Sequence, residues 1–154
     1  MREAIGGTWL FGLVLTFIVF FASFLAVSIN YSKAFNVKNN IVDLIGKYEG
    51  NNCKSRKKIA EYLSDTGYLV IGNCPNDYDA YGLNGNYETS QRGYYCVKKE
   101  TNSGDAIIKK DYYRIVTFFK LDLPMVGDLT TFKIKGETEA IYFAEDDAKN
   151  NSCS

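Results

Sequence analysis

The chain begins with a long uncharged stretch and continues with alternating apolar and polar positions. Residues 8–29 carry Leu, Val, Ile and Phe throughout and hold no charged residue. A helix crosses the roughly 30 Å hydrocarbon core of a bilayer with about 20 apolar residues. Trp9 and Tyr31 flank the stretch, where aromatic side chains meet the membrane–water interface. The pattern predicts one membrane-spanning helix.

Two other interpretations of this stretch are less consistent with its length. A cleaved signal peptide has an apolar core of about 7–15 residues and a small-residue cleavage site. The core here is longer, and Ala26 and Ser28 form only a poor site. A buried helix of this apolar purity is unusual in so small a protein. We therefore expect a permanent single-pass anchor, with residues 1–30 forming a short tail and the membrane helix.

The helix is expected to continue beyond the membrane. Residues 30–49 contain no proline, and their one glycine is Gly46. Apolar side chains recur there mostly at spacings of three and four, which is typical of an amphipathic helix. They are Tyr31, Ala34, Phe35, Val37, Ile41, Val42, Leu44, Ile45 and Tyr48. Gly50-Asn51-Asn52 is a stop signal. Residues 31–50 thus form an amphipathic extension of the membrane helix.

Residues 51–147 are predicted to form a small α+β domain, followed by a polar tail at 148–154. Residues 55–64 form a short helix that ends near Gly67. Its predicted inward side chains are Ile59, Ala60 and Leu63, and its predicted outward side chains are Arg56, Lys57, Lys58 and Glu61. Short strands are expected at residues 68–71 and 94–99. A polar loop at 75–93 separates them, and a turn at 101–105 follows.

The strongest strand signals lie at residues 112–123 and 131–143. Both alternate with a period of two, which indicates half-buried strands. Phe132, Ile134, Ala140 and Tyr142 are predicted to share the inner face of the second strand. The two strands are expected to pair antiparallel, across a loop that includes Gly127-Asp128. Because their apolar face needs a cover, we expect the amphipathic half of the long helix to pack on it.

Four cysteines follow the membrane helix, and an even number suits an oxidising compartment. Cys74 and Cys96 flank the polar loop, and a bridge between them would close a loop of about 20 residues. Cys53 and Cys153 would complete the pairing, although four cysteines allow three connectivities. The two alternatives for Cys74 and Cys96 are a disulfide and two buried thiols.

Orientation rests on two opposing signals. Lys33, Lys38 and Lys47 follow the span, and the positive-inside rule then favours a cytoplasmic domain. The cysteines favour the oxidising side. Since the lysines also fit a helix that runs out into solvent, we expect a cytoplasmic N-terminus and an extracytoplasmic domain.

Charge and composition exclude several function classes. The 18 Lys+Arg balance the 18 Asp+Glu, so the basic excess of a nucleic-acid binder is missing. The chain has no histidine, which excludes Ser-His-Asp and Cys-His catalysis and histidine-containing zinc sites. Asp77, Asp79, Gly82 and Glu88 have part of the spacing of a calcium loop, but a surface loop explains them better. We expect no cofactor, no metal and no enzymatic activity.

The layout resembles that of pilins and pseudopilins: a short polar N-terminus, an apolar helix with an amphipathic continuation, and a small antiparallel sheet. Residues 117–127 (TFFKLDLPMVG) followed by 131–134 (TFKI) are similar to the C-terminal part of TadE-like and TadG-like proteins of tight-adherence pilus assembly. The resemblance implies a structural or assembly component that contacts other pilin-like subunits. The chain departs from the pilin pattern at one point, because cleavage after Gly6 would place Phe11 where pilins carry Glu.

Helix packing is the expected mode of assembly. Small residues allow membrane helices to approach closely, and the candidates are Gly12, Ala22, Ser23 and Ala26. The predicted partners are the lipid bilayer and other membrane or pilin-like subunits. The alternative function is a membrane-tethered ligand-binding or receptor module that uses the loop at 75–93.

Overall fold

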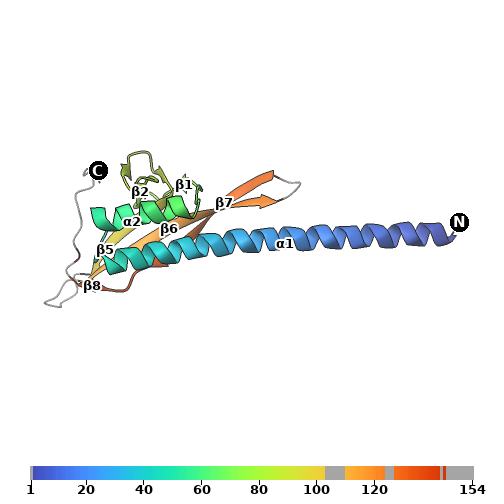
Figure 1. Cartoon of the computed structure of the whole chain (residues 1–154), viewed down its shortest axis with the longest axis horizontal. Coiled ribbons are helices and arrows are strands. Elements are labelled where there is room, and N and C mark those ends of the chain that lie inside the picture. The colour runs from blue at the N-terminus through green and yellow to red at the C-terminus, as the bar shows by residue number, and fades with distance from the viewer. Residues whose placement is uncertain (1, 103–109, 124–126, 143, 145–154) are drawn as a thin grey trace.

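The computed structural model describes residues 2–102, 110–123, 127–142 and 144. Helix α1 (Arg2–Lys47) is unbroken, and the other described elements gather along its C-terminal half (Figure 1). With 46 residues at about 1.5 Å each, α1 is roughly 70 Å long. The predicted continuation of the apolar helix into an amphipathic half is confirmed. The helix ends just before the predicted stop signal, where Glu49 and Gly50 take positive φ angles of 55° and 151°.

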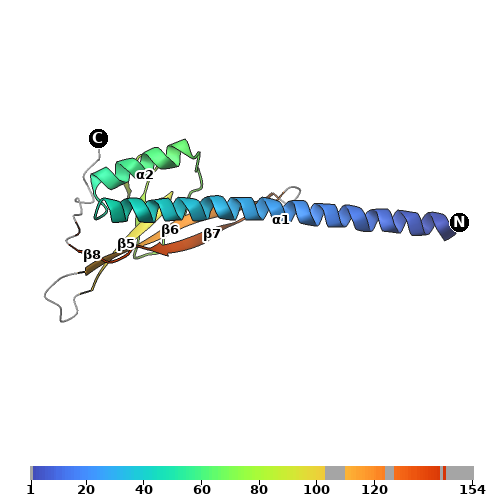
Figure 2. The same cartoon turned by 60° about the horizontal axis from the view of Figure 1, so that its bottom comes forward.

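Helix α2 (Cys53–Asp65) lies beside α1 and returns toward its N-terminal half (Figure 2). The Asn52 side chain caps α2 by accepting a hydrogen bond from the Ser55 amide at 3.0 Å. Gly67 follows the helix at a φ of +60°, and its amide donates to the Ser64 carbonyl at 3.1 Å. The predicted helix and its glycine end signal are therefore confirmed.

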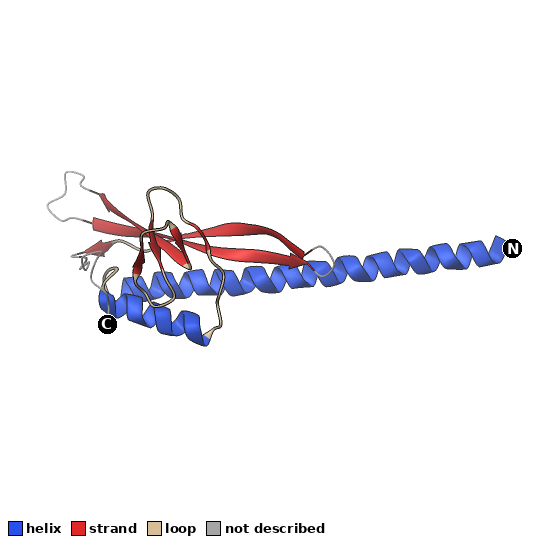
Figure 3. Ribbon diagram, turned by 90° about the horizontal axis from the view of Figure 1, so that it is seen from above, coloured by secondary structure: helices blue, strands red, loops and turns tan. Residues whose placement is uncertain are grey.

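The strands form two antiparallel sheets. The larger sheet has the order β3-β2-β5-β6-β7, and β8 also pairs with β6; β1 and β4 form a separate two-stranded sheet. The strands are β1 (Gly72–Asn73), β2 (Asp79–Tyr81), β3 (Tyr87–Glu88), β4 (Arg92–Gly93), β5 (Tyr95–Asn102), β6 (Lys110–Leu123), β7 (Gly127–Glu137) and β8 (Ile141–Tyr142). Both helices lie on one face of the larger sheet (Figure 3). The fold is α+β, with a long N-terminal helix packed on an antiparallel sheet, as predicted.

Strands β6 and β7 form a long antiparallel hairpin that runs along α1 toward its N-terminal half (Figures 1 and 3). The predicted pairing of these strands is confirmed. Gly127 and Asp128 were predicted in a loop, but they lie in β7, opposite Leu123 and Asp122. The hairpin is longer than the alternation suggested because pairing resumes beyond a register shift after Lys120.

The predicted strand at residues 131–143 is interrupted at Thr138. The Thr138 amide donates to the Tyr113 carbonyl, and the Thr138 hydroxyl accepts from the Tyr113 amide, both at 3.0 Å. The interruption changes which residues face inward, so Ile141 is buried and Tyr142 is exposed. Phe132 pairs with Phe119, which contacts Tyr31 of α1, so Phe132 lies on the helix-side face as predicted, although it is 42% exposed. The predicted inner face is therefore wrong for Tyr142.

The centre of the sheet is buried on both faces. On one face, Tyr95, Val97, Tyr113 and Ile115 pack against buried side chains of α1 and α2. On the other face lies a second cluster: Cys74, Ala80, Cys96, Val116 and Phe118. The prediction that β6 is half-buried is wrong at its centre, since residues 115–118 are all buried. The segment around β1 covers this second face of the sheet. The alternation of apolar and polar residues in β6 did not predict that cover.

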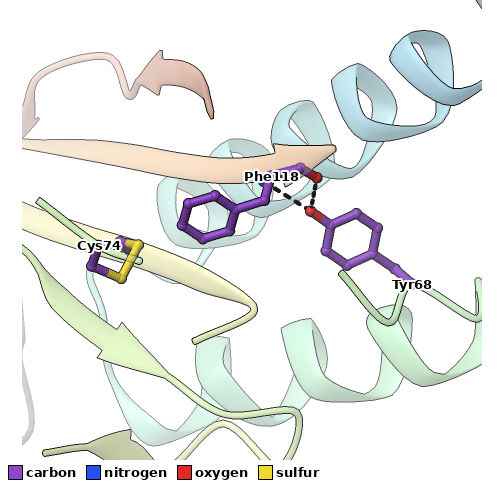
Figure 4. The surroundings of a disulfide bond; sticks show 4 residues. Tyr68, Cys74 and Phe118 are labelled. Carbon is purple, nitrogen blue, oxygen red and sulfur yellow. Dashed lines mark hydrogen bonds between the residues drawn. A yellow bond between two sulfur atoms is a disulfide. The ribbon is translucent and has the colours of Figure 1, made fainter. Parts of the chain in front are cut away.

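Residues 68–71 do not form the predicted strand, and the neighbouring ladder is the short β1. The Tyr68 hydroxyl accepts from the Phe118 amide at 2.9 Å and donates to the Phe118 carbonyl (Figure 4). The ladder between β5 and β6 ends at Tyr95 and Thr117, so Phe118 is the first β6 residue beyond it. The phenol thus takes the place of a missing strand, and the segment crosses the end of β5 instead of pairing along it.

The polar loop at 75–93 is more ordered than predicted, because it contains β2, β3 and β4. Close backbone approaches explain two of its glycines. A Cβ at Gly93 would lie 2.7 Å from the Tyr81 carbonyl oxygen, and one at Gly85 would lie 2.8 Å from that of Arg56. The segment is therefore packed into the domain.

Candidate membrane interface

The N-terminal half of α1 carries a continuous apolar surface. From Trp9 to Leu25, every large apolar side chain is exposed, and Trp9 and Phe20 reach 74% and 68%. α1 is long and apolar enough to cross a membrane. Burial of a large apolar side chain contributes about 1.5–3 kcal/mol, so lipid would stabilise this surface by roughly 20 kcal/mol or more. An apolar surface of this size is a membrane or protein interaction site.

The hydroxyl groups in this stretch suit a medium without water. The hydroxyls of Thr16, Ser23 and Ser28 donate to the carbonyls of Gly12, Val19 and Phe24, each at 2.9 Å. Each of these bonds lies within the helix and spans four residues. Because these donors are satisfied within the helix, they can enter hydrocarbon without an unpaired donor.

The four predicted packing residues lie on one side of α1. At about 100° per residue, Gly12, Ala22, Ser23 and Ala26 fall within an arc of about 100°. Gly12 and Ala22 are exposed, whereas Ser23 and Ala26 are half-buried within the chain. A Cβ added at Gly12 would meet nothing within 4 Å. Gly12 and Ala22 are therefore the more accessible of the four to a neighbouring helix.

Aromatic side chains gather where the helix meets the domain. The Phe119 ring stacks on Phe132 with centroids 5.1 Å apart, and it meets Tyr31 edge-on at 5.7 Å. Tyr31 also stacks on Phe35 at 6.3 Å, and the Lys38 ammonium lies 4.2 Å from the centre of the Phe35 ring. Tyr31, Phe35 and Phe132 are each at least 40% exposed. The sequence places Tyr31 and Phe35 one turn apart on the helix, but it did not predict that Phe119 and Phe132 would join them, because these rings come from distant positions.

The predicted Cys74–Cys96 disulfide is present, with a Cα–Cα distance of 5.7 Å (Figure 4). It joins the chain after β1 to the N-terminal end of β5, on the sheet face opposite the helices. Cys53 carries no free thiol either. Its predicted partner, Cys153, lies outside the described residues, as does the predicted polar tail at 148–154.

Burial raises the pKa of two tyrosine side chains in the domain. Desolvation raises the pKa of Tyr68 to about 12, and the hydrogen bond to the Phe118 backbone opposes this shift. Desolvation likewise raises the pKa of Tyr95, whose ring stacks on Tyr81 at 5.3 Å. Both phenols remain neutral at physiological pH and serve the core.

Arg56 was predicted on the outer face of α2, but it is 1% exposed. It lies three residues before Ile59 and seven before Leu63, so the helical period places it on their buried face. Its guanidinium lies 5.8 Å from the centre of the Tyr81 ring and donates to the Cys53 sulfur at 3.7 Å. Arg56 therefore belongs to the core and not to a basic surface run with Lys57 and Lys58.

The residues with partial calcium-loop spacing do not converge. Asp77 pairs with Lys98 at 3.7 Å, while Asp79 lies in β2 and Glu88 in β3. Within the part of the chain that the structure describes, no three His, Cys, Asp or Glu side chains form a metal-binding group. No protein-family model, curated protein or solved structure matches this chain.

Proposed function

We propose that this chain is a single-pass membrane-anchored component of a surface or secretion apparatus, with a pilin-like build and a structural or assembly role. Its N-terminus lies in the cytoplasm and its domain outside. The chain acts by packing its helix against neighbouring subunits, and it catalyses no reaction. Lipid and other membrane or pilin-like subunits are its partners.

The supporting observation is the continuity of α1. One helix carries the exposed apolar surface in its first half and the buried Val37, Ile41 and Ile45 in its second half. No flexible linker separates the two halves, so the position of the helix in the membrane fixes the position of the domain. Such rigid coupling suits a subunit that must be placed accurately beside its neighbours.

The Cys74–Cys96 disulfide supports the proposed orientation, because disulfides persist in oxidising compartments. The positive-inside argument loses part of its weight, since Lys38 packs within the domain. Its side-chain carbon Cδ lies 2.5 Å from where a Cβ on Gly136 of β7 would be, and its ammonium lies beside Phe35. Lys38 therefore has a structural role that is independent of orientation.

Self-association in membranes tests the proposal. Two copies of the full chain with different affinity tags are produced together, and one tag is used to capture the other from detergent-solubilised membranes. We expect capture of the wild-type chain, and strongly reduced capture after Gly12→Leu or Ala22→Leu, since the added bulk separates the helices. The isolated chain has space at Gly12, so its own fold remains intact.

The matched control is Val14→Leu, which adds a methylene on the other side of α1, about 130° from the centre of the small-residue arc. It is expected to leave self-capture unchanged. Equal capture of all variants would contradict packing through the small residues. Absence of capture in the wild type would contradict self-assembly.

One observation favours the alternative ligand-binding function. An open hollow of about 430 Å³ lies beside Tyr78 of the 75–93 segment and is lined by Arg114, Lys135 and Glu137. Its volume lies within the range of small-molecule sites, but its lining is charged where such sites are mostly apolar. A ligand there would raise the melting temperature of the domain, and Arg114→Gln would abolish that shift.

A further inference from the structure

The face of α1 that packs on the domain continues into the uncharged stretch at 8–29. In the domain this face carries buried side chains at Ala34, Val37, Ile41 and Ile45. Toward the N-terminus the same spacing of three and four continues through half-buried side chains at Asn30, Val27, Ala26 and Ser23. Ala22 has the same side chain as Ala26 but is exposed. A neighbouring element therefore lies beside α1 at Ala26.

The hairpin of β6 and β7 is that neighbour, since α1 contacts both strands. A Cβ on Gly136 of β7 would lie 2.5 Å from the Lys38 side chain of α1. Further along the hairpin, Phe119 of β6 meets Tyr31 of α1 edge-on at 5.7 Å. Successive contacts thus move toward the N-terminus of α1, in the direction that the hairpin takes in Figures 1 and 3.

The end of the hairpin reaches the level of the uncharged stretch. Beyond Phe119, β6 continues for four residues to Leu123, which pairs with Gly127 of β7. At about 3.3 Å per residue this is roughly 13 Å, a length that about nine residues of a helix occupy. Because Phe119 lies beside Tyr31, the hairpin end is level with the half-buried Ser23.

The uncharged part of α1 is longer than a bilayer core requires. Glu3 and Lys33 are the charged residues that bound it, so residues 4–32 carry no charge. They extend over roughly 43 Å of helix, whereas the hydrocarbon core is about 30 Å thick. About 13 Å of the uncharged helix therefore lies outside the core. The hairpin runs beside this length at the C-terminal end of the uncharged part.

Exposed apolar side chains gather at the same level. Leu69, which is 67% exposed, lines a small hollow together with Asn30 and Phe119. Tyr31 and Phe132 are 48% and 42% exposed and lie against Phe119 from two sides. These side chains come from α1, from the segment after α2 and from the hairpin. Exposed aromatic and apolar side chains at one level are characteristic of a membrane–water interface.

Two features limit how deeply the hairpin enters a bilayer. Asp122 and Asp128 stand opposite each other in the ladder near its end, and carboxylates are costly in hydrocarbon. Beyond Thr117 the described part of β6 has left the β5 ladder, and its outer backbone groups need water. Both features place the hairpin end at the boundary of the hydrated headgroup layer and not in the middle of the core.

We propose that the end of the β6–β7 hairpin is a second membrane contact, which lies in the headgroup layer beside α1. The occupant of this surface is lipid, with Leu69, Tyr31 and Phe132 at the outer boundary of the layer. The inference rests on the proposed membrane anchor. Because the contact lies on one side of α1, it would fix which side of the domain faces the bilayer.

The test measures the depth of single tryptophans in the full chain, reconstituted at one copy per nanodisc. Trp9 is the one tryptophan of the sequence, so Trp9→Phe provides a dark background. Leu123→Trp and Phe132→Trp are made separately in that background. Lipid brominated near the headgroup end of its acyl chains should quench the indole at position 123 most and the indole at position 132 less. Lipid brominated at the chain ends should quench both weakly.

Tyr142→Trp in the same background is the matched control. Tyr142 is 47% exposed, like Phe132, but β8 pairs with the opposite end of β6, at Lys110 and Asp111. Its indole should be quenched by acrylamide in water and not by brominated lipid. Equal quenching by brominated lipid at positions 123 and 142 overturns the proposal.

A second copy of the chain is the competing occupant of this surface. An indole at position 123 that neither brominated lipid nor acrylamide quenches is covered by protein, and this result overturns the lipid contact. Quenching there by acrylamide alone overturns it as well. The native Trp9 reports the anchor separately. Absence of lipid quenching of Trp9 in the wild type overturns the anchor and the hairpin contact together, whereas quenching of Trp9 without quenching at position 123 overturns only the hairpin contact.

Discussion

The two halves of α1 share one backbone but differ in what covers them. Leu10, Phe11 and Phe24 of the first half are each more than 60% exposed, whereas Val37, Ile41 and Ile45 of the second half are fully buried. Both halves contain many apolar residues. The first half has no charged residue from residue 8 to residue 29, while the second interleaves lysines, asparagines and an aspartate. Polar spacing therefore distinguishes a helix suited to lipid from one suited to a protein core.

Removal of the first half is expected to have the largest effect. A chain that lacks residues 2–29 loses the whole apolar surface, which is worth roughly 20 kcal/mol or more in lipid. It should leave the membrane fraction after carbonate extraction and stay folded, as measured by circular dichroism. Leu15→Ile in the full chain is the control and should remain in the membrane. A shortened chain that stays in the membrane would contradict the assignment of the span.

Equivalent truncations in the two halves should separate their roles. Ile41→Ala leaves a cavity in the core and should lower the free energy of unfolding of the domain by about 2–5 kcal/mol. Ile18→Ala removes the same atoms from the exposed half and should leave that free energy unchanged. Denaturant unfolding in micelles, followed by near-ultraviolet circular dichroism, measures both variants. Equal losses of unfolding free energy in the two variants would show that the two halves of α1 have the same environment.

The Cys74–Cys96 disulfide lies in the domain that packs against the C-terminal half of α1. Cys74→Ala/Cys96→Ala opens a loop with a sequence separation of 22 and should cost about 3 kcal/mol of unfolding free energy. Membrane insertion should not change. Thiol labelling of intact cells tests the orientation at the same time. Detection of reduced cysteines shielded in the cytosol would refute an extracytoplasmic domain.

Substitution of Tyr68 is expected to have the smallest of these effects on stability, and this effect depends on pH. Its pKa is raised from 10.0 to about 12, so the fold favours the neutral phenol. The resulting stability, up to about 2.7 kcal/mol, is present below about pH 10 and is lost as pH rises toward 12. Tyr68→Phe should remove the share of the pH dependence that Tyr68 carries, while the share of the buried Tyr95 remains. It should also lower stability at pH 7, since both Phe118 backbone groups lose their partner.

The exposed Tyr142 provides the matched control for this measurement. Tyr142→Phe should keep the pH profile of the wild type, as followed by thermal melts between about pH 8 and pH 12, a range that spans the titration of a phenol. Identical profiles for Tyr68→Phe and the wild type would show that Tyr68 does not carry the effect.

Local patterns predicted the features that depend on neighbouring residues in the sequence. Uncharged length identified the apolar half of α1, the spacing of three and four identified Val37, Ile41 and Ile45, and alternation identified the long β6 and β7 strands. The Cys74–Cys96 bridge also followed from where the two cysteines lie relative to the polar loop. Each of these properties is set within a short part of the chain, the longest being the sequence separation of 22 between the two cysteines.

The predictions failed where residues distant in the sequence decide the structure. Tyr68 leaves the strand pattern because its hydroxyl bonds to Phe118, 50 residues later. Val116 and Phe118 are buried because the β1 segment covers the face that alternation assigned to solvent. The half-burial of Ser23 and Ala26 could not be predicted for the same reason, since the β6–β7 hairpin beside them is distant in the sequence.

Because α1 is one uninterrupted helix, a tilt of its first half also moves the domain that packs on its second half. Transmembrane helices tilt by about 20° on average, and the tilt changes with bilayer thickness. The 17 residues from Tyr31 to Lys47 extend about 26 Å beyond the span, so that tilt displaces the far end sideways by roughly 9 Å. In the proposed membrane-anchored state, the lateral position of the domain would therefore change with the thickness of the bilayer.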